Sequence, residues 1–255
     1  MIVIIMAGGM GKRMGSDLPK VLHKVTSPHN KDLSYPMLIH VIMTAMKLNP
    51  SKIFVVVGKF REVICKTVNM YVRDNTISNS DLIQYVDQEL ALGTGHAIKC
   101  VLPYLNPYLS ENALILSGDV PLISLNTLEN LNGLENKLLV TELDNPYGCG
   151  RVLIDLFDKI KSIREEKDCD QIEKQIKLVN CGIYQIKTND LVHLIPMINN
   201  SNKAQEYYLT DIVQLMIQHN IQVEILVLER SNQWEIKNVN TQQDLSELND
   251  FVYSM

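Results

Sequence analysis

Short, almost continuous apolar runs in the first half of the chain constrain its fold more than any other feature. The runs predict strands at Ile2–Met6, Ile53–Gly58, Leu82–Val86 and Ala113–Ser117. Strands that are apolar along their whole length are buried on both faces, which is typical of parallel sheets. Between them, apolar residues at helical spacing predict helices over Pro36–Leu48, over Glu62–Val72 and from about Thr94. This alternation predicts an α/β fold with helices on both faces of the sheet.

The pattern changes after Pro121, where shorter strand-like segments are interrupted by Asn, Asp and Gly. We expect a mixed or antiparallel extension of the sheet, with strands at Leu138–Leu143, Arg151–Leu156, Ile160–Arg164 and Val179–Ile186 and helices near Leu209–His219 and Thr241–Val252. No repeat, low-complexity tract or Pro/Ser-rich linker divides the chain. We therefore predict a single domain over residues 1–255, with one lobe over about 1–120 and a second over about 121–255.

Composition excludes several classes of function. The formal net charge is −5, so the chain lacks the basic footprint of a nucleic-acid or anionic-membrane binder. No apolar segment is long enough to span a bilayer. The five cysteines form no C-x-x-C pair and are odd in number, which predicts reduced thiols in a cytoplasmic protein.

A glycine-rich, basic loop follows the first predicted strand. The stretch Met6–His23 (MAGGMGKRMGSDLPKVLH) holds four glycines, two lysines and one arginine. It matches neither the P-loop nor the dinucleotide-binding fingerprint. Its chemistry still favours an anion, because glycines let backbone N–H groups approach closely and Arg13 and Lys20 add positive charge. A strand-to-helix turn with solvated basic side chains is the alternative interpretation.

Read through to its end, this loop resembles the signature of sugar-nucleotide pyrophosphorylases, and SDLPKVLH resembles the bacterial N-acetylglucosamine-1-phosphate uridylyltransferases. Seven further motifs follow in family order: QELALGTGHA (88–97), SGDVPLI (117–123), YGCGRV (147–152), EEKD (165–168), NCGIY (180–184), AQEYYLTDI (204–212) and NVNT (238–241). Each motif is weak alone, but the ordered set covers nearly the whole chain. The resemblance implies a Rossmann-like, glycosyltransferase-A-like nucleotidyltransferase fold with a mostly parallel mixed sheet and a second, sugar-binding lobe.

The resemblance also implies a reaction, in which a sugar-1-phosphate oxygen attacks the α-phosphorus of UTP and pyrophosphate leaves. Such a transfer needs in-line positioning and charge neutralisation. By resemblance, Arg13 faces the triphosphate and Lys20 the α-phosphate, as the catalytic residues. Nucleotide binding is implied for Met6, Ala7, Gly8, Gly9, Gln88, Gly93 and Thr94, with the Gln88 amide suited to the uracil edge.

A magnesium ion and the sugar account for the other implied site residues. Asp119 and Asn240 match the family's metal ligands, and one carboxylate with phosphates and waters is a usual Mg²⁺ arrangement. N-acetylglucosamine-1-phosphate is the implied partner of a sugar site formed by Gly118, Gly150, Glu165, Asn180, Tyr208 and Thr210. Without the resemblance, Asp119 is a turn former or cap, and Asn240 and Thr210 are helix caps. We expect His96 to be structural, since the attacking sugar phosphate is already ionised.

The chain departs from the family pattern at a few positions. Gly8 replaces an alanine and Lys12 a threonine, while Ser117 and Cys149 each replace a tyrosine, which concerns the shape of the sugar pocket. The segment Thr26–Tyr35 is longer than the family's turn and predicts an extended surface loop. Because the chain stops just after the uridylyltransferase region, we expect neither the left-handed β-helix acetyltransferase domain nor the trimer that it imposes.

Three functions stay open at this point. The leading one is Mg²⁺-dependent synthesis of UDP-N-acetylglucosamine from UTP and N-acetylglucosamine-1-phosphate. A second keeps the fold but uses another sugar-1-phosphate, or CTP with a polyol phosphate, against which Gln88 and its motif argue. A third is a non-catalytic regulator that binds a nucleotide sugar, against which the joint presence of Arg13, Lys20, Asp119 and Asn240 argues. The sequence leaves the oligomeric state open.

Overall fold

The computed structural model describes residues 1–9, 11–77 and 79–255, with the side chain of Lys12 also left out. The strands are β1 (Ile2–Met6), β2 (Lys24–Ser27), β3 (Asn30–Pro36), β4 (Lys52–Val57), β5 (Ile83–Asp87), β6 (Asn112–Ser117), β7 (Asn136–Glu142), β8 (Arg151–Ile154), β9 (Ile160–Arg164), β10 (Leu178–Lys187) and β11 (Val223–Val227). The α-helices are α1 (Met37–Met46), α2 (Arg61–Arg73), α3 (Thr94–Val101), α4 (Leu125–Leu131), α5 (Thr188–Leu194), α6 (Asp211–Gln218) and α7 (Gln242–Ser254).

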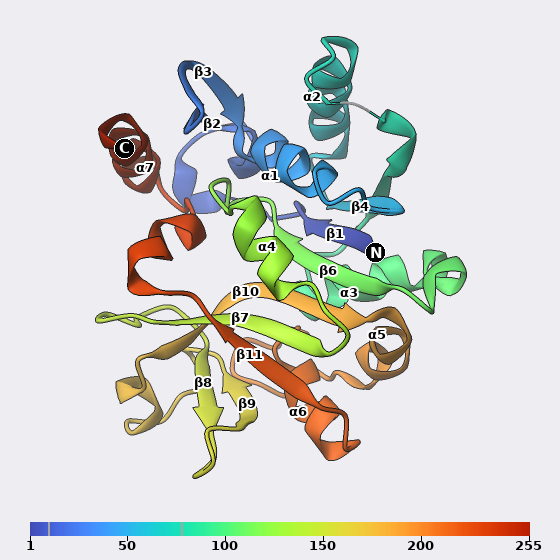
Figure 1. Ribbon diagram of the computed structural model, residues 1–255, viewed down its shortest axis with the longest axis vertical. Helices are drawn as coiled ribbons and strands as arrows, with labels where there is room; N and C mark the ends of the chain where they lie inside the picture. Colours follow the sequence, from blue (N-terminus) through green and yellow to red (C-terminus); the bar gives the residue numbers. More distant parts are fainter. Residues whose placement is uncertain (10, 78) are drawn as a thin grey trace.

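One mixed sheet organises the part of the chain that the structure describes. Its strand order is β11-β7-β10-β6-β1-β4-β5, and β8 and β9 extend it from β10. The strands β1, β4, β5 and β6 are parallel to one another, as the apolar runs predict. Strand β10 is antiparallel to both β6 and β7, which confirms the predicted change after the first half. The fold is therefore the predicted α/β fold with a mixed sheet (Figure 1).

Helices cover both faces of this sheet, because each strand of its centre is apolar on both sides. On one face, Ile2 and Ile4 of β1 pack with residues of α3, α5 and α6. On the other, Val3 and Ile5 pack with residues of α1, α2 and α4. All four of these β1 side chains are fully buried. Burial of this kind contributes roughly 1.5–3 kcal/mol for each large aliphatic side chain.

The C-terminal helix α7 returns to the N-terminal half and packs on the hairpin β2–β3 (Figure 1). A small core under α7 joins this helix to the glycine-rich loop and to β2, through Met14, Val25, Leu248 and Val252. The Oδ1 atom of Asn249 accepts a hydrogen bond of 2.8 Å from the Thr26 amide. The segment Thr26–Tyr35 is thus a paired hairpin, which corrects the predicted surface loop. Its polar composition hid it, since most side chains of β3 are exposed.

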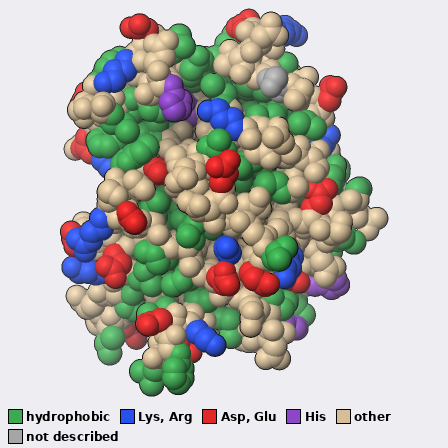
Figure 2. All heavy atoms as spheres, viewed as in Figure 1, with side chains coloured by type: hydrophobic (Ala, Val, Ile, Leu, Met, Phe, Trp, Pro, Cys, Tyr) green, Lys and Arg blue, Asp and Glu red, His purple; other side chains and the backbone are tan. Residues whose placement is uncertain are grey.

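Predicted boundaries agree with the structure to within a few residues, but some elements were not predicted. Helices α4 and α5 have seven residues each, too few to establish a helical period. Strand β11 is partly exposed and lies at the end of the sheet. No helix in the described ranges is long and apolar enough to cross a membrane. Acidic and basic side chains are interspersed over the face seen in Figure 2.

Candidate active site

The candidate site begins where the parallel strands β1 and β6 end side by side. Met6 and Ser117, the last residues of the two strands, are register partners. A loop follows each strand, and the Gly118 amide donates a 2.9 Å hydrogen bond to the Met6 carbonyl. Ligands of open α/β sheets bind at such carboxyl ends, so the first loop and the SGDV turn share one edge.

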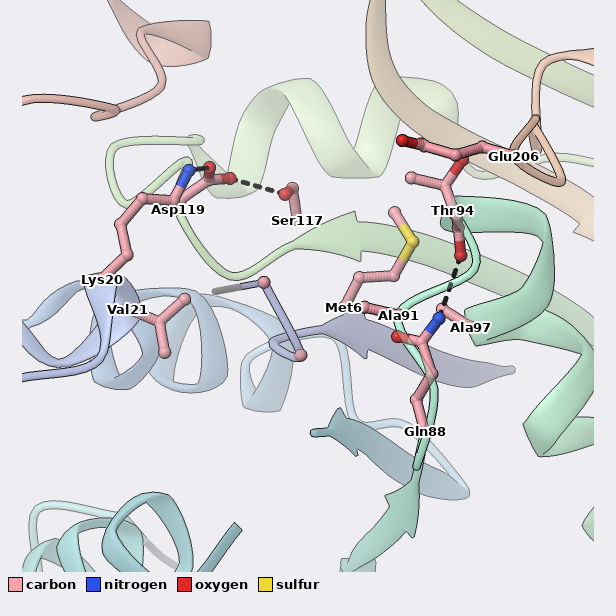
Figure 3. Close-up of a pocket in the computed structure, with 13 residues that line it drawn as sticks. Met6, Lys20, Val21, Gln88, Ala91, Thr94, Ala97, Ser117, Asp119 and Glu206 are labelled. Atoms are coloured by element: carbon pink, nitrogen blue, oxygen red, sulfur yellow. Dashed lines mark hydrogen bonds and ion pairs between the residues drawn. The ribbon is translucent and has the colours of Figure 1, made fainter. Parts of the chain in front are cut away.

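A cavity of about 330 Å³ opens at this edge. Its lining combines glycine backbone, one lysine, two carboxylates and small apolar side chains: Met6, Gly8, Gly9, Lys20, Val21, Gln88, Ala91, Gly93, Thr94, Ala97, Ser117, Asp119 and Glu206. Figure 3 shows Lys20, Asp119 and Ser117 on one side and Gln88, Thr94 and Glu206 on the other, with Met6 between them. The cavity thus brings together eight of the site residues expected from the sequence.

One side of the cavity is a cation-centred cluster. The Lys20 ammonium forms an ion pair with Asp119 Oδ2 and donates to Asn240 Oδ1 at 2.9 Å. The side chains of Lys20 and Asp119 are only 14% and 13% exposed, so this pair is shielded from bulk water. Charge-assisted hydrogen bonds of this type are about twice as strong as neutral ones. Asp119 and Asn240, which are 99 and 220 positions away in the sequence, therefore both contact the Lys20 nitrogen.

Local backbone geometry positions the lysine. Lys20 begins the short 3-10 helix Lys20–Leu22, which follows Pro19. Gly11 packs directly against it with a φ of +57°, in the left-handed region that favours glycine. A Cβ on Gly11 would lie 2.7 Å from the Lys20 Cβ. The glycine at this position is therefore required for the loop to close on Lys20.

The first turn of α7 positions Asn240. The N-cap of α7 is Thr241, whose side chain accepts from the Asp244 amide, so Asn240 is not the cap. The Asp244 carboxylate accepts in return from the amides of Asn240 and Thr241, at 2.8 and 2.9 Å. The Val239 amide also donates to the Asp119 carbonyl, at 3.2 Å. The alternative prediction that Asn240 caps the helix is therefore wrong. The capping box uses Thr241 and Asp244 instead and leaves the Asn240 side chain available to Lys20.

The opposite side of the cavity is built around Gln88, which is 7% exposed. Its Nε2 donates to the Gly93 carbonyl at 3.0 Å and lies 3.3 Å from His96 Nδ1. Burial, followed by the charge of Lys99, lowers the pKa of His96 and so favours the neutral imidazole. His96 does not line the cavity, and its contact with Gln88 agrees with the structural role expected for it.

Gly93 connects this side to the stretch AQEYYLTDI (204–212). Its φ is +114°, and a Cβ there would lie 2.5 Å from the Tyr207 carbonyl. The Gly95 amide donates to the Tyr207 carbonyl at 2.7 Å, and the Leu209 amide donates to Thr94 Oγ1 at 3.0 Å. The start of α3 is therefore hydrogen-bonded to the AQEYYLTDI stretch, which joins the two candidate half-sites.

Apart from Gly118, which precedes Asp119, the predicted sugar residues form a second group outside this cavity. The Thr210 hydroxyl donates to Glu165 Oε1 at 2.9 Å and makes no capping bond at the start of α6. Glu165 Oε1 lies 3.5 Å from the position of a Cβ on Gly150, and the Asn180 amide donates to the Gly150 carbonyl at 2.9 Å. Burial raises the pKa of Glu165, and nearby carboxylates raise it further.

Asn180 makes further contacts through its side chain, and Tyr208 is the remaining sugar candidate. The Asn180 side-chain amide donates to the Tyr184 hydroxyl at 2.6 Å, and its Oδ1 accepts from the Gly182 amide at 3.1 Å. Tyr208 lines a small separate cavity of about 120 Å³ together with Glu165. Burial, followed by the charges of nearby carboxylates, raises the pKa of Tyr208. Glu165, Thr210 and Asn180 thus each have at least one hydrogen-bond partner within the protein.

Two predicted residues, the catalytic candidate Arg13 and the nucleotide-binding candidate Ala7, do not line the cavity. Arg13 is exposed on the 3-10 helix Lys12–Met14 and does not line it. Ala7 is buried, and its amide donates to the Val56 carbonyl at 2.8 Å, so that N–H is used within the sheet. The charge expected from Lys12 belongs to a side chain outside the described part of the structure.

Two polar residues that line the cavity, Ser117 and Glu206, were not among the predicted site residues. The hydroxyl of Ser117, a position where the chain departs from the family pattern, donates to Asp119 Oδ1 at 2.5 Å. Glu206 lies across the cavity beside Thr94 (Figure 3). The position of Ser117, two residues before an acidic residue at a strand end, is the signal that could have identified it.

Comparison with known proteins identifies the family. The MobA-like NTP transferase domain matches residues 3–141, more than half of the chain. A probable UDP-N-acetylglucosamine pyrophosphorylase of Acanthamoeba polyphaga mimivirus is 41% identical over 250 residues, which cover 95% of this chain and 92% of that protein. This chain belongs to the UDP-N-acetylglucosamine pyrophosphorylase family. It is a nucleotidyltransferase, and the resemblance inferred from its motifs is confirmed.

Other members of the pyrophosphorylase family are longer. The bifunctional protein GlmU of Paraburkholderia phymatum is 37% identical over 97% of this chain, but the match covers 51% of GlmU. The GlmU of Nitrosococcus oceani is 38% identical over 98% of this chain and 51% of its own. This chain therefore spans about half the length of these GlmU relatives.

A solved structure shares the fold of this pyrophosphorylase-family chain. A putative glucose-1-phosphate thymidylyltransferase from Bacillus anthracis superposes with a TM-score of 0.71, over 100% of this chain and 96% of that one. The two sequences are 18% identical, so the likeness concerns the fold alone. It confirms the nucleotidyltransferase architecture that the motifs implied.

The oxygen atoms around Lys20 fit a divalent cation. No group of three or more His, Cys, Asp or Glu side chains within the described ranges forms a metal site. Mg²⁺, however, is usually held by one or two protein oxygens, with substrate phosphates and waters completing its shell. Asp119 Oδ2 and Asn240 Oδ1 already face the same positive charge, that of Lys20. Such a pair of oxygens is the donor set that Mg²⁺ prefers.

Proposed function

We propose that this enzyme forms UDP-N-acetylglucosamine and pyrophosphate from UTP and N-acetylglucosamine-1-phosphate. The observation that carries the proposal is the convergence of Lys20, Asp119 and Asn240 at the ends of β1 and β6. The chain has this cluster and 41% identity to a probable UDP-N-acetylglucosamine pyrophosphorylase. A nucleotide-binding regulator without catalysis would have no need of the cluster.

The proposed chemistry is a single in-line phosphoryl transfer. A phosphate oxygen of the sugar phosphate bonds to the α-phosphorus of UTP, while the bond from that phosphorus to the bridging oxygen of pyrophosphate breaks. No protein base is needed, because the attacking phosphate is already ionised. The protein therefore contributes positioning and charge neutralisation, which supply most of the catalysis in reactions of this class.

The nucleotide is proposed to lie in the 330 Å³ cavity. Gly8 and Gly9 would let the backbone approach its phosphates, and Gln88 with Gly93 and Thr94 would contact the base. The ammonium of the cluster would neutralise the α-phosphate where charge develops in the transition state. Arg13 would meet the outer part of the triphosphate, where it extends beyond the cavity.

Asp119 and Asn240 would hold Mg²⁺ through the oxygens that now accept from Lys20. When bound there, Mg²⁺ would neutralise phosphate charge at the reacting centre. Lys20 would then have to give up its two oxygen partners, which frees its ammonium for the α-phosphate. The cluster thus supports a double role, as an ion pair in the free enzyme and as a phosphate site in the complex.

The second lobe is proposed to bind the sugar. Glu165 offers a carboxylate to sugar hydroxyls, and Thr210, Asn180 and Tyr208 offer hydroxyl and amide groups. Gly150 allows the backbone to come close. The free cysteines of the described residues support a reducing, cytoplasmic setting for this reaction.

The test is pyrophosphate release from the purified protein with UTP, Mg²⁺ and a panel of sugar-1-phosphates. CTP, ATP and GTP serve as controls for the nucleotide. We expect fast release with UTP and N-acetylglucosamine-1-phosphate and at least about tenfold slower release with the other pairs, the discrimination that one lost polar contact gives. Preference for another sugar would leave the mechanism standing and change the substrate. No release with any pair would refute the proposed function.

A further inference from the structure

We propose that Ser117 is a positioning residue for the metal-binding carboxylate of Asp119. This inference rests on the proposed function, because it concerns the cation that Asp119 would hold. The Ser117 hydroxyl donates to Asp119 Oδ1 at 2.5 Å, while Oδ2 faces Lys20. The serine thus engages one carboxylate oxygen and leaves the other directed at the cation position, as Figure 3 shows.

The backbone makes this contact before any ligand arrives. Ser117 ends β6, and the Val120 amide donates to the Ser117 carbonyl at 3.3 Å, which closes a turn over residues 117–120. The Gly118 amide is bonded to Met6 and the Asp119 carbonyl accepts from the Val239 amide. The turn is therefore fixed at each step between the serine and the aspartate, so little further entropy is lost when the side chains pair.

A carboxylate needs such a partner because its last torsion is soft. The terminal sp³–sp² torsion of aspartate has a broad, two-fold distribution. Without a bond to Oδ1, the Asp119 carboxylate can rotate and present its oxygens in several ways. A short hydroxyl–carboxylate bond is charge-assisted and of the strong class, so it selects one orientation. Asn240 then completes the pair with Asp119 Oδ2, as their shared contact with Lys20 indicates.

The first experiment measures direct binding of Mn²⁺, used as a probe for Mg²⁺, by the electron paramagnetic resonance signal of free Mn²⁺. The Lys20→Met variant is the background, because it removes the ammonium that competes for the same oxygens. Adding Ser117→Ala is expected to weaken Mn²⁺ binding about tenfold, and adding Ser117→Thr to restore it to within about twofold. Ser110→Ala, at an exposed serine outside the cavity, is the matched control.

The second experiment uses the otherwise unaltered chain and measures pyrophosphate release. Ser117→Ala should raise the Mg²⁺ concentration for half-maximal activity about tenfold, with the KM values of both substrates within about twofold at saturating Mg²⁺. Unchanged Mn²⁺ affinity in the first experiment would overturn the proposal. A raised substrate KM with normal metal dependence would also overturn it, because Ser117 would then be a substrate contact. If the wild-type chain releases no pyrophosphate, the proposed function fails, while the Mn²⁺ titration still decides the role of Ser117.

Discussion

The two halves of the candidate site are organised by opposite kinds of chemistry. In the first half, Lys20 balances Asp119, and both line an open cavity beside glycine backbone. In the second half, Glu165 and Asn180 are held by neutral partners, the Thr210 and Tyr184 hydroxyls. The first half therefore contains an ion pair, and the second contains neutral hydrogen bonds with one weakly compensated carboxylate.

This difference fits the two ligands proposed for the site. A triphosphate carries negative charge, so its site needs a cation. A lysine that is paired with a carboxylate in the free protein can supply that cation when it changes partner. A sugar is neutral apart from its phosphate, so its site needs oriented donors and acceptors. We expect changes in the first half to affect the chemical step and changes in the second half to affect sugar affinity or stability.

Loss of the carboxylate proposed to hold Mg²⁺ should produce the largest effect. Asp119→Ala removes one of two oxygens expected to hold Mg²⁺, so kcat should fall about 10³-fold, as expected when several kcal/mol of charge stabilisation are lost. Nucleotide binding, measured by calorimetry with UTP, should persist. The control is Asp81→Ala at an exposed position. Near-normal turnover of Asp119→Ala at saturating Mg²⁺ would refute the mechanism.

Lys20→Met should have the next largest effect on turnover, and an effect of opposite sign on metal binding. We expect kcat to fall about 10²-fold, because a charged donor at the α-phosphate is lost. Binding of Mn²⁺ without nucleotide should become several-fold tighter, since Asp119 and Asn240 lose their competing cation. Calorimetric titration of Mn²⁺ into this variant and into Lys47→Met, an exposed control, measures the second effect. Weaker Mn²⁺ binding by Lys20→Met would show that the lysine supports the site instead of competing for it.

How much of this could be predicted differs between the fold and the site. The central strands were predictable because parallel strands buried on both faces are apolar at almost every position, as in β1 and β4. The hairpin β2–β3 was not, because its second strand is mostly polar and exposed and is stabilised by the distant helix α7. Inference from hydrophobic periodicity detects buried apolar side chains. Strand β3 is mostly exposed, and two of the three buried residues of β2, Thr26 and Ser27, are polar.

The cluster around Lys20 is a different case. Its members are 99 and 220 residues from Lys20, and no local pattern states that they meet. Only the resemblance to a family brought Asp119 and Asn240 together in advance. The Ser117–Asp119 bond is local, yet a serine at a strand end has many possible partners. The site residues could thus be identified from the sequence. Their hydrogen bonds could not, because those bonds depend on how the turns pack.

A smaller effect is expected from Tyr184→Phe in the second half. The variant removes the acceptor for the Asn180 amide but keeps the ring of a residue that is 3% exposed. The KM for the sugar phosphate should rise about fivefold, the effect of one hydrogen bond, while the KM for UTP stays within about twofold. Two-substrate kinetics measures both constants. Tyr85→Phe is the control, because the Tyr85 hydroxyl is buried without a hydrogen-bond partner in the described structure. An equal rise in both KM values would contradict the division of the site.

Glu165→Gln should have the smallest effect of these variants, a modest increase in the stability of the folded chain. Burial raises the pKa of Glu165 above its ordinary value of 4.5, with the carboxylates of Asp211, Asp168 and Glu206 adding to the shift. Between the ordinary and the raised pKa the folded chain binds more protons than the unfolded chain, so stability falls as the pH rises. Below about pH 4.5 the side chain is neutral in both states and the penalty is absent.

Glutamine keeps an oxygen for the Thr210 hydroxyl but carries no charge, so it removes this penalty. We expect the Tm of Glu165→Gln to exceed that of the wild type by about 2–4 °C at about pH 7.5, the shift that roughly 1 kcal/mol gives in a chain of this size. The gain should disappear as the pH approaches 4.5, the ordinary pKa, whereas Glu129→Gln, at an exposed position, should show no such trend. Calorimetry at several pH values measures both variants. If Tm does not rise at neutral pH, the Glu165 charge carries no penalty and the second half compensates it as fully as the first half compensates Asp119. If the rise persists in acid, it does not come from the Glu165 charge, and the same conclusion holds.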